Sequence, residues 1–213
     1  MLDHKLIFRA SSLADIMTEP KSKSDKLSVG AKTAITKMAK EAVYGYDERI
    51  TSKPMTKGIQ CEDQSIELLN SVLFSSHTKN TERKTNEWIT GECDIFTGSK
   101  IIDIKSSWSL ATFPALAEDG ENKTYTWQLA AYMWLWNVDS AAIAYCLVST
   151  PEELIGYEDR HLHIVDHIAP ELRVTLLHQE RDKTMEARIV EKVEAGREYY
   201  RQVIERIANE HTF

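Results

Sequence analysis

The sequence predicts one mixed α/β domain over residues 1–213, and three observations support that class. Hydrophobic residues make up 42% of the chain and charged residues 28%, which is the composition of a globular protein with a buried core. Apolar residues recur at helical spacing near both ends of the chain, whereas residues 78–105 form short β-prone segments separated by turns. Because no Pro-, Gly- or Ser-rich linker divides the chain, we expect a single domain.

Three helices are predicted before the β-prone region. A short helix over 11–18 begins at a serine cap and is followed by Pro20. A second helix over 28–44 ends at Gly45. A third helix over 57–74 is predicted from an apolar stripe formed by Ile59, Ile66, Leu69 and Leu73.

The middle of the chain changes from helical spacing to short segments with turns between them. The β-prone segments are 78–83, 87–90, 92–96 and 100–105, and their spacing is typical of a hairpin or meander. After them the pattern predicts an aromatic helix over 124–136, strands over 141–149 and 172–178, and a long amphipathic helix over 182–209. This order of elements gives the mixed α/β class.

Charge and cysteine content exclude several classes of protein. The net charge is −7, but residues 1–60 hold 11 Lys and Arg against 7 Asp and Glu, so a basic region can still meet phosphate. The three cysteines form no CxxC pair, which suits a reducing cytoplasm and offers no disulfide framework or four-cysteine cluster. No apolar run is long enough for a membrane span or an export signal, so we expect a cytoplasmic protein.

Two aspartates and a lysine form the constellation with the clearest chemistry. Asp94 is followed eight residues later by Asp103-Ile-Lys105. In a strand, side chains alternate between the two faces, so Asp103 and Lys105 share one face while Ile104 points into the core. Two carboxylates and an ammonium on one face are costly to bury unless they bind something, and carboxylates suit Mg²⁺ or Mn²⁺. A surface hairpin with a cross-strand salt bridge remains an equal alternative on spacing alone.

Two flanking features favour the site over the salt bridge. Gly58-Ile-Gln-Cys-Glu62 begins a helix upstream and offers a third carboxylate. Gln128-Leu-Ala-Ala-Tyr132 places an amide and a phenol four residues apart on one helix face. His161 and His163 are a weaker candidate for a metal site, since no acidic or cysteine partner has a zinc spacing. An exposed polar strand edge is the better interpretation of those histidines.

The ordered series G-x3-E, D, D-x-K and Q-x3-Y resembles the RecB-type branch of the PD-(D/E)XK nuclease superfamily. Within that branch the chain is most similar to the phage lambda-type (YqaJ-like) alkaline exonucleases, and Arg9-Ala-Ser-Ser-Leu13 resembles the start of their first helix. The resemblance covers residues 8–150. It implies a restriction-endonuclease-like core, in which helices flank a central mixed β-sheet and a long C-terminal helix follows.

The resemblance also implies roles for residues at the matching positions. Asp94 and Asp103 would bind metal together with the Ile104 carbonyl, and Glu62 would bind or orient a second metal. Lys105 would activate water, and Gln128 would hold the lysine or a phosphate, with Tyr132 in support. The residues expected to contact DNA are Arg9, Ser11 and Ser12, which match the 5′-phosphate region, and Trp108, which follows the active strand.

Two positions depart from the lambda-type pattern. Asp103 stands where that subgroup usually has Glu, and its side chain is one methylene shorter. Glu92 stands where the lambda-type enzymes place a phosphate-binding serine, two residues before Asp94. The details of a 5′-phosphate pocket are therefore open at Glu92.

The function implied by the resemblance is a Mg²⁺-dependent exonuclease that acts on duplex DNA ends. Such an enzyme digests the 5′-ended strand to mononucleotides and leaves 3′ overhangs for phage-type recombination, with two metal ions per site and Mn²⁺ as a substitute. The expected partners are DNA ends, two further copies in a homotrimeric ring, and a single-strand annealing protein, in a bacterial cytoplasm that holds a phage or prophage. An endonuclease of restriction or junction-resolving type, or a catalytically silent DNA-end clamp, remains as an alternative.

Overall fold

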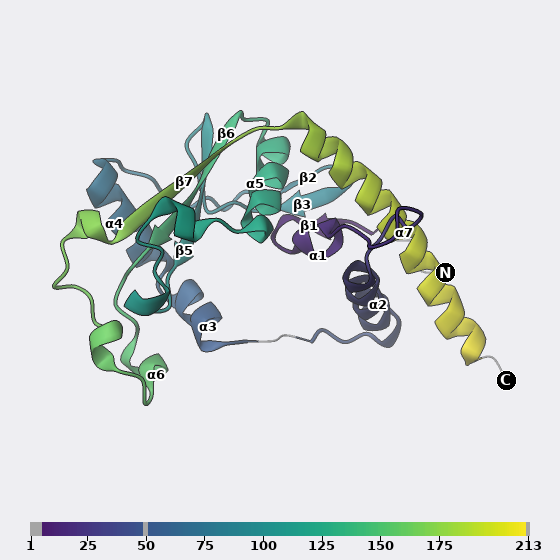
Figure 1. Ribbon diagram of the computed structural model, residues 1–213, viewed down its shortest axis with the longest axis horizontal. Helices are drawn as coiled ribbons and strands as arrows, with labels where there is room; N and C mark the ends of the chain where they lie inside the picture. Colours follow the sequence, from purple (N-terminus) through teal and green to yellow (C-terminus); the bar gives the residue numbers. More distant parts are fainter. Residues whose placement is uncertain (1–5, 49–50, 212–213) are drawn as a thin grey trace.

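The computed structural model describes residues 6–48 and 51–211, and a four-stranded mixed sheet stands at its centre (Figure 1). The strand order is β4-β5-β6-β7, with bounds Ile95–Phe96, Lys100–Ser106, Ser140–Cys146 and Val174–Glu180. Strands β5 and β6 are parallel, whereas β4 and β7 pair antiparallel to their neighbours. A parallel pair needs a crossover connection, and here the crossover contains helix α5, Lys123–Trp136. The predicted mixed sheet with flanking helices is confirmed.

Strand β5 separates two apolar cores. Ile101 faces a core that includes Leu129 and Met133 of α5. Ile102 and Ile104 face a second core with helix α4, Glu62–Leu73. This alternation places Asp103 and Lys105 on the side of β5 that faces α5, as the period of two predicts.

A second, three-stranded sheet has the order β1-β3-β2. Its strands are β1 (Phe8–Arg9), β3 (Ile89–Gly91) and β2 (Lys84–Thr85), with β1 parallel and β2 antiparallel to β3. Helix α5 packs against both sheets and closely against β3, because a Cβ on Gly91 would lie 2.7 Å from Cε1 of Tyr132. A glycine at this position therefore allows β3 and Tyr132 to approach each other beside the four-stranded sheet.

Helices cover the side of the molecule around the small sheet (Figure 1). The 3-10 turn η1 (Ala10–Ser12) leads into α1 (Ala14–Met17), and α2 (Val29–Tyr44) packs on the long closing helix α7 (Lys183–Glu210). The predicted end of the second helix at Gly45 is confirmed, and the structure shows side-chain caps at the starts of α2 and α7. Ser28 caps α2, Gly45 ends α2 in the left-handed region with φ 67°, and Asp182 caps α7.

The predicted helix over 57–74 is wrong in one respect, because the chain forms two helices there. Helix α3 spans Lys53–Gln60 and α4 begins at Glu62, with Cys61 between them. Ile59, predicted to face inward, is 79% exposed, and Lys57 is buried in its place. The buried Lys57 ammonium donates hydrogen bonds to three backbone carbonyls, which offsets part of the cost of burying its charge.

Two other segments differ from the prediction. Residues 78–83 form an extended loop, and the strand that follows it, β2, begins only at Lys84. The His161–His163 region contains the 3-10 turn η4 (Arg160–Leu162), and His163 is buried where an exposed strand edge was expected. The remaining short elements are helix α6 (Glu152–Ile155) and the 3-10 turns η2 (Leu110–Thr112), η3 (Ala117–Gly120) and η5 (Pro170–Leu172).

None of the helices within residues 6–48 and 51–211 combines the length and the hydrophobicity that a membrane crossing needs.

Candidate active site

Asp103 and Lys105 form an ion pair on the α5 side of strand β5. Their Oδ2 and Nζ atoms lie 2.6 Å apart, and the Asp103 side chain is 1% exposed. Oδ2 of Asp103 has the Lys105 ammonium as its partner, and the contact acts both as an ion pair and as a hydrogen bond on the Asp103 carboxylate. Burial raises the pKa of Asp103, and the Lys105 charge opposes that shift. The pair therefore presents a buried carboxylate whose charge depends on the Lys105 ammonium beside it.

Asp94 lies directly before β4 and reaches across to β5. Its Oδ2 accepts a hydrogen bond from the backbone N–H of Ile104 at 2.6 Å. Burial raises the pKa of Asp94, and the neighbouring Asp103 carboxylate raises it further. A cation bound between two carboxylates that repel each other in this way would stabilise both negative charges, and so would bind more strongly than to either carboxylate alone.

Lys105 is enclosed by groups that favour its charged form. Burial acts to lower the pKa of Lys105, but Asp103, Asp94 and Tyr125 together outweigh that effect and the pKa is raised. The ammonium also lies 4.6 Å from the ring centroid of Tyr125 on α5. Before any cation binds, Lys105 is thus an ammonium that can stabilise negative charge.

Gln128 and Tyr132 extend from α5 toward Asp103. The Gln128 Nε2 donates to Asp103 Oδ1 at 3.2 Å and to the Tyr132 hydroxyl oxygen at 3.1 Å. The expected partner of Gln128 was Lys105 or a phosphate, and the structure gives it the Asp103 carboxylate. The predicted pairing of Gln128 with Tyr132 on one helix face agrees with this contact.

Glu62 begins α4 at the edge of the same cluster. Its carboxylate acts on the charges of Asp94 and Asp103, but its closest partner is Lys79, with 2.5 Å between Nζ and Oε2. Sequence reasoning missed Lys79, since the segment 78–83 was expected to be a strand. The position of Tyr125 could have been predicted, because it lies three residues before Gln128 and therefore on the same face of one helix.

The donor set fits a divalent cation at Asp94 and Asp103. Within residues 6–48 and 51–211, no three His, Cys, Asp or Glu side chains are gathered closely enough to hold a metal by themselves. Mg²⁺, however, is usually bound by one or two carboxylates, with waters and substrate phosphates in its other positions. The buried Asp103 carboxylate, with the Asp94 carboxylate beside it, is the group whose negative charge such a cation would stabilise.

A polar hollow of about 310 Å³ lies beside the small sheet. Arg9, Ser11, Arg83 and Glu92 are among its lining residues, and Arg83 pairs with Glu92 at 3.1 Å. Arg9 and Ser11 thus meet as expected, whereas the Ser12 hydroxyl turns back to donate to the Arg9 carbonyl at 3.4 Å. Sequence reasoning missed Arg83, which the fold brings opposite Glu92.

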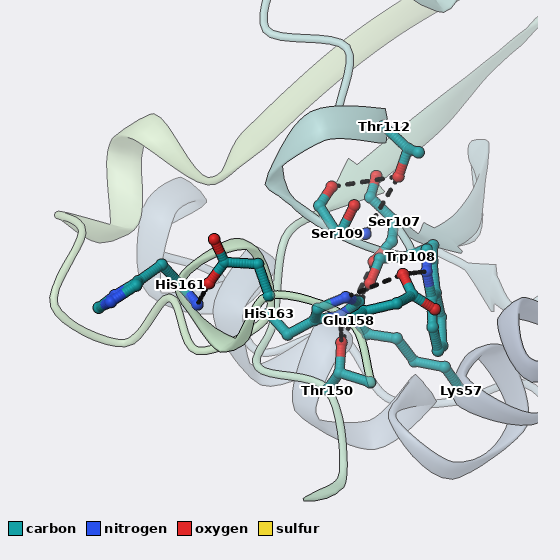
Figure 2. A network of polar contacts seen from close by, with 10 residues as sticks. Lys57, Ser107, Trp108, Ser109, Thr112, Thr150, Glu158, His161 and His163 are labelled. Atoms are coloured by element: carbon teal, nitrogen blue, oxygen red, sulfur yellow. Dashed lines mark hydrogen bonds and ion pairs between the residues drawn. The ribbon is translucent and has the colours of Figure 1, made fainter. Parts of the chain in front are cut away.

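Trp108 lies in a separate network beyond the end of β5 (Figure 2). Its indole N–H donates to Glu158 Oε2 at 3.0 Å, and its ring meets His163 edge-on with 5.0 Å between centroids. Figure 2 also shows the Lys57 side chain running beneath this group, where Nζ binds the Ser107 and Trp108 carbonyls at 2.7 and 3.0 Å. The expected DNA contact is thus a side chain already oriented by Glu158.

Solved exonuclease structures resemble this chain over nearly its whole length. A phage-related exonuclease from Haemophilus somnus 129PT is 38% identical with a TM-score of 0.90, over 96% of this chain and 97% of that chain. The alkaline exonuclease of Laribacter hongkongensis is 16% identical with a TM-score of 0.69, over 96% and 92%, and so shares the fold. No protein-family model and no curated protein matches the sequence. Because its likeness to the Haemophilus somnus protein extends over nearly all of both chains, this chain belongs to the phage-related exonucleases of the lambda (YqaJ-like) type and is a nuclease.

Proposed function

We propose that the chain is a Mg²⁺-dependent exonuclease of the PD-(D/E)XK type that digests the 5′-ended strand of duplex DNA. The observation that supports this most is the joint placement of Asp94, Asp103 and Lys105. The two carboxylates act on each other's charge, and the lysine lies 2.6 Å from one of them. A simple surface salt bridge would be solvated, whereas the Asp103 side chain is 1% exposed.

The chemistry can be divided among the residues of the site. Asp94 and Asp103 would hold the cation, which supplies charge neutralisation at the scissile phosphate and makes a water molecule more acidic. Lys105 would stabilise the charge that develops on the phosphoryl oxygens, because its ammonium is already oriented by Asp103 and Tyr125. Gln128 fixes the rotamer of Asp103 through Oδ1.

The polar hollow supports the proposed polarity of digestion. Arg9, Arg83 and Ser11 offer cationic and hydroxyl donors of the kind that bind a terminal phosphate. In the structure Arg83 forms an ion pair with Glu92. This pair would have to open before Arg83 could bind a phosphate. The Laribacter hongkongensis exonuclease was solved in complex with dAMP, a mononucleotide of the size that we propose as product.

Assembly into a ring would reconcile duplex binding with the net charge of −7. We propose a homotrimer, in which the basic first 60 residues line a channel for the duplex and the acidic remainder faces outward. A single-strand annealing protein would then take up the 3′ overhang in the cytoplasm of the bacterial host. Light scattering tests the ring, and a monomeric mass for a protein that digests processively against excess competitor duplex would refute it.

End-labelled duplex provides the test of the proposed activity. Linear duplex labelled at the 5′ end or the 3′ end is incubated with Mg²⁺, with Mn²⁺ and with EDTA, and covalently closed plasmid runs in parallel. We expect early release of 5′ label as mononucleotide, no loss of closed plasmid and no reaction in EDTA. Early release of 3′ label would reverse the polarity, cutting of closed plasmid would identify an endonuclease, and DNA binding without any cleavage would identify a silent end clamp.

A further inference from the structure

Lys79 forms an ion pair with Glu62, the carboxylate at the edge of the proposed active site. Its Nζ lies 2.5 Å from Glu62 Oε2, and Asp63 and Asp94 also act on its charge. Lys79 belongs to none of the motifs that identify the site in the sequence. It is therefore an additional cation beside the carboxylates that the proposed function assigns to metal binding.

The backbone around Lys79 is attached to both elements that carry these carboxylates. On the following residue, the Asn80 N–H donates to the Asp94 carbonyl at 2.7 Å, and Nδ2 donates to the Cys93 carbonyl at 2.9 Å. On the other side, Asn70 of α4 exchanges two hydrogen bonds with the backbone of His77, at 2.8 and 2.9 Å. These contacts anchor the loop, so the position of Lys79 is set by the fold.

The pair is solvated enough to open. The Lys79 side chain is 44% exposed and that of Glu62 is 20% exposed. An ion pair with this exposure contributes little to folding stability. Its effect on a ligand is larger, because any cation that approaches Glu62 must first displace the ammonium. A lysine suits such an exchange, since it is a compact charge on a flexible stem.

We propose that Lys79 competes with the divalent cation for Glu62, so that this side of the site binds a cation only when Lys79 leaves the carboxylate. The proposal rests on the metal dependence proposed above. It extends that function by explaining how the DNA-free protein keeps the acidic cluster partly neutralised. In the DNA-free protein, the affinity for divalent cations is accordingly lower than the three carboxylates would give by themselves.

Calorimetric titration of Mn²⁺ into DNA-free protein tests the competition without relying on activity. Lys79→Gln should bind Mn²⁺ more tightly by roughly tenfold, the size of an ordinary coupling between contacting charges. Lys79→Arg keeps the charge and should resemble the wild type. Lys84→Gln is the matched control, because it removes one positive charge from neighbouring β2, where Lys84 pairs with Glu82. It should leave the affinity for Mn²⁺ within about twofold of the wild type.

A double-mutant cycle with Glu62→Gln shows whether Lys79 acts through Glu62. We expect the gain from Lys79→Gln to disappear in the Glu62→Gln background. An equal gain in both backgrounds, an unchanged affinity in Lys79→Gln, or no Mn²⁺ binding by any variant would overturn the competition. Failure of the end-labelled duplex assay together with an intact cycle would instead refute the proposed activity alone. Circular dichroism of each variant confirms that it is folded.

Discussion

The backbone N–H of Ile104 donates to Oδ2 of Asp94, and the two atoms lie 2.6 Å apart. Ile104 lies between Asp103 and Lys105 on β5, so this bond fixes Asp94 to the strand that carries the other two groups. The position of Asp94 relative to Asp103 is thus set by backbone geometry as well as by a side-chain rotamer. Sites that bind small, geometrically demanding cations depend on such fixed ligands.

Asp94→Asn should abolish digestion while leaving the fold intact. The amide oxygen can still accept from Ile104, but the charge that a cation requires is lost. Because the wild-type carboxylate is buried and its pKa is raised by burial and by Asp103, the variant should melt at the same temperature or higher. Calorimetry should show weakened Mg²⁺ binding. Unchanged metal affinity here and in Asp103→Asn would place the metal site elsewhere, and exposed Asp139→Asn serves as the control.

Lys105→Ala should lower the chemical step by about 10²-fold or more, the usual loss for a positioned charge-stabilising group. DNA binding should remain close to wild type, and metal binding should be retained or become tighter, because the ammonium beside the Asp103 carboxylate is removed. The melting temperature should fall, because buried Asp103 loses its ionic partner at 2.6 Å. Lys100→Ala removes a lysine from the start of the same strand and should retain full activity. Equal single-turnover rates for Lys105→Ala and the wild type would remove Lys105 from the mechanism.

Local patterns predicted which residues meet at the centre of the candidate site. The alternation of β5 places Asp103 and Lys105 on one face, and the helical spacing of Gln128 and Tyr132 brings both toward Asp103. Lys79 and Arg83 were missed for a physical reason. Their positions depend on the path of an irregular loop, which is set by contacts distant in sequence, such as the bond from Asn80 to the Asp94 carbonyl.

The helix predicted over 57–74, which forms two helices in the structure, shows a similar limit of prediction from sequence. An apolar stripe over 57–74 predicts one continuous helix with Ile59 inside. The structure buries Lys57 instead, because three backbone carbonyls at the ends of β5 and β6 can satisfy its ammonium. Hydropathy ranks lysine as an exposed residue, so no sequence pattern indicated a buried one. The chain turns at Cys61 and presents Ile59 to solvent.

Gln128→Leu tests a positioning residue. The change leaves Asp103 Oδ1 without its donor and should lower the free energy of unfolding by about 1–3 kcal/mol. We expect kcat to fall roughly tenfold with little change in KM, since the amide acts on the rotamer of Asp103 and on the charge of its carboxylate. Mn²⁺ binding measured by calorimetry should also weaken, which a purely structural role would not produce. Gln202→Leu, at an exposed position of α7, should change none of these quantities.

Lys57 gives a prediction about stability that is independent of catalysis. Lys57→Met removes the donor of three hydrogen bonds but also the cost of burying an ammonium, so we expect a loss of roughly 2–4 kcal/mol at pH 7. Lys53→Met, on the exposed start of α3, should be close to neutral. Chemical denaturation of the three proteins measures both changes. A loss for Lys57→Met no larger than for Lys53→Met would contradict the structural role.

The pH dependence of that loss has a definite sign. Burial lowers the pKa of Lys57 from its ordinary value of 10.5 to about 8, and the Cys61 thiol beside it opposes the shift. Between pH 8 and 10.5 the unfolded chain therefore holds a proton that the folded chain has released. Stability that depends on Lys57 rises with pH over this window. The difference in unfolding free energy between the wild type and Lys57→Met should widen from pH 8 to 10.5, in the Cys61→Ala background as well. A narrowing difference would mean that the three carbonyls hold the pKa of Lys57 above its ordinary value, because they bind the ammonium more strongly than burial disfavours it.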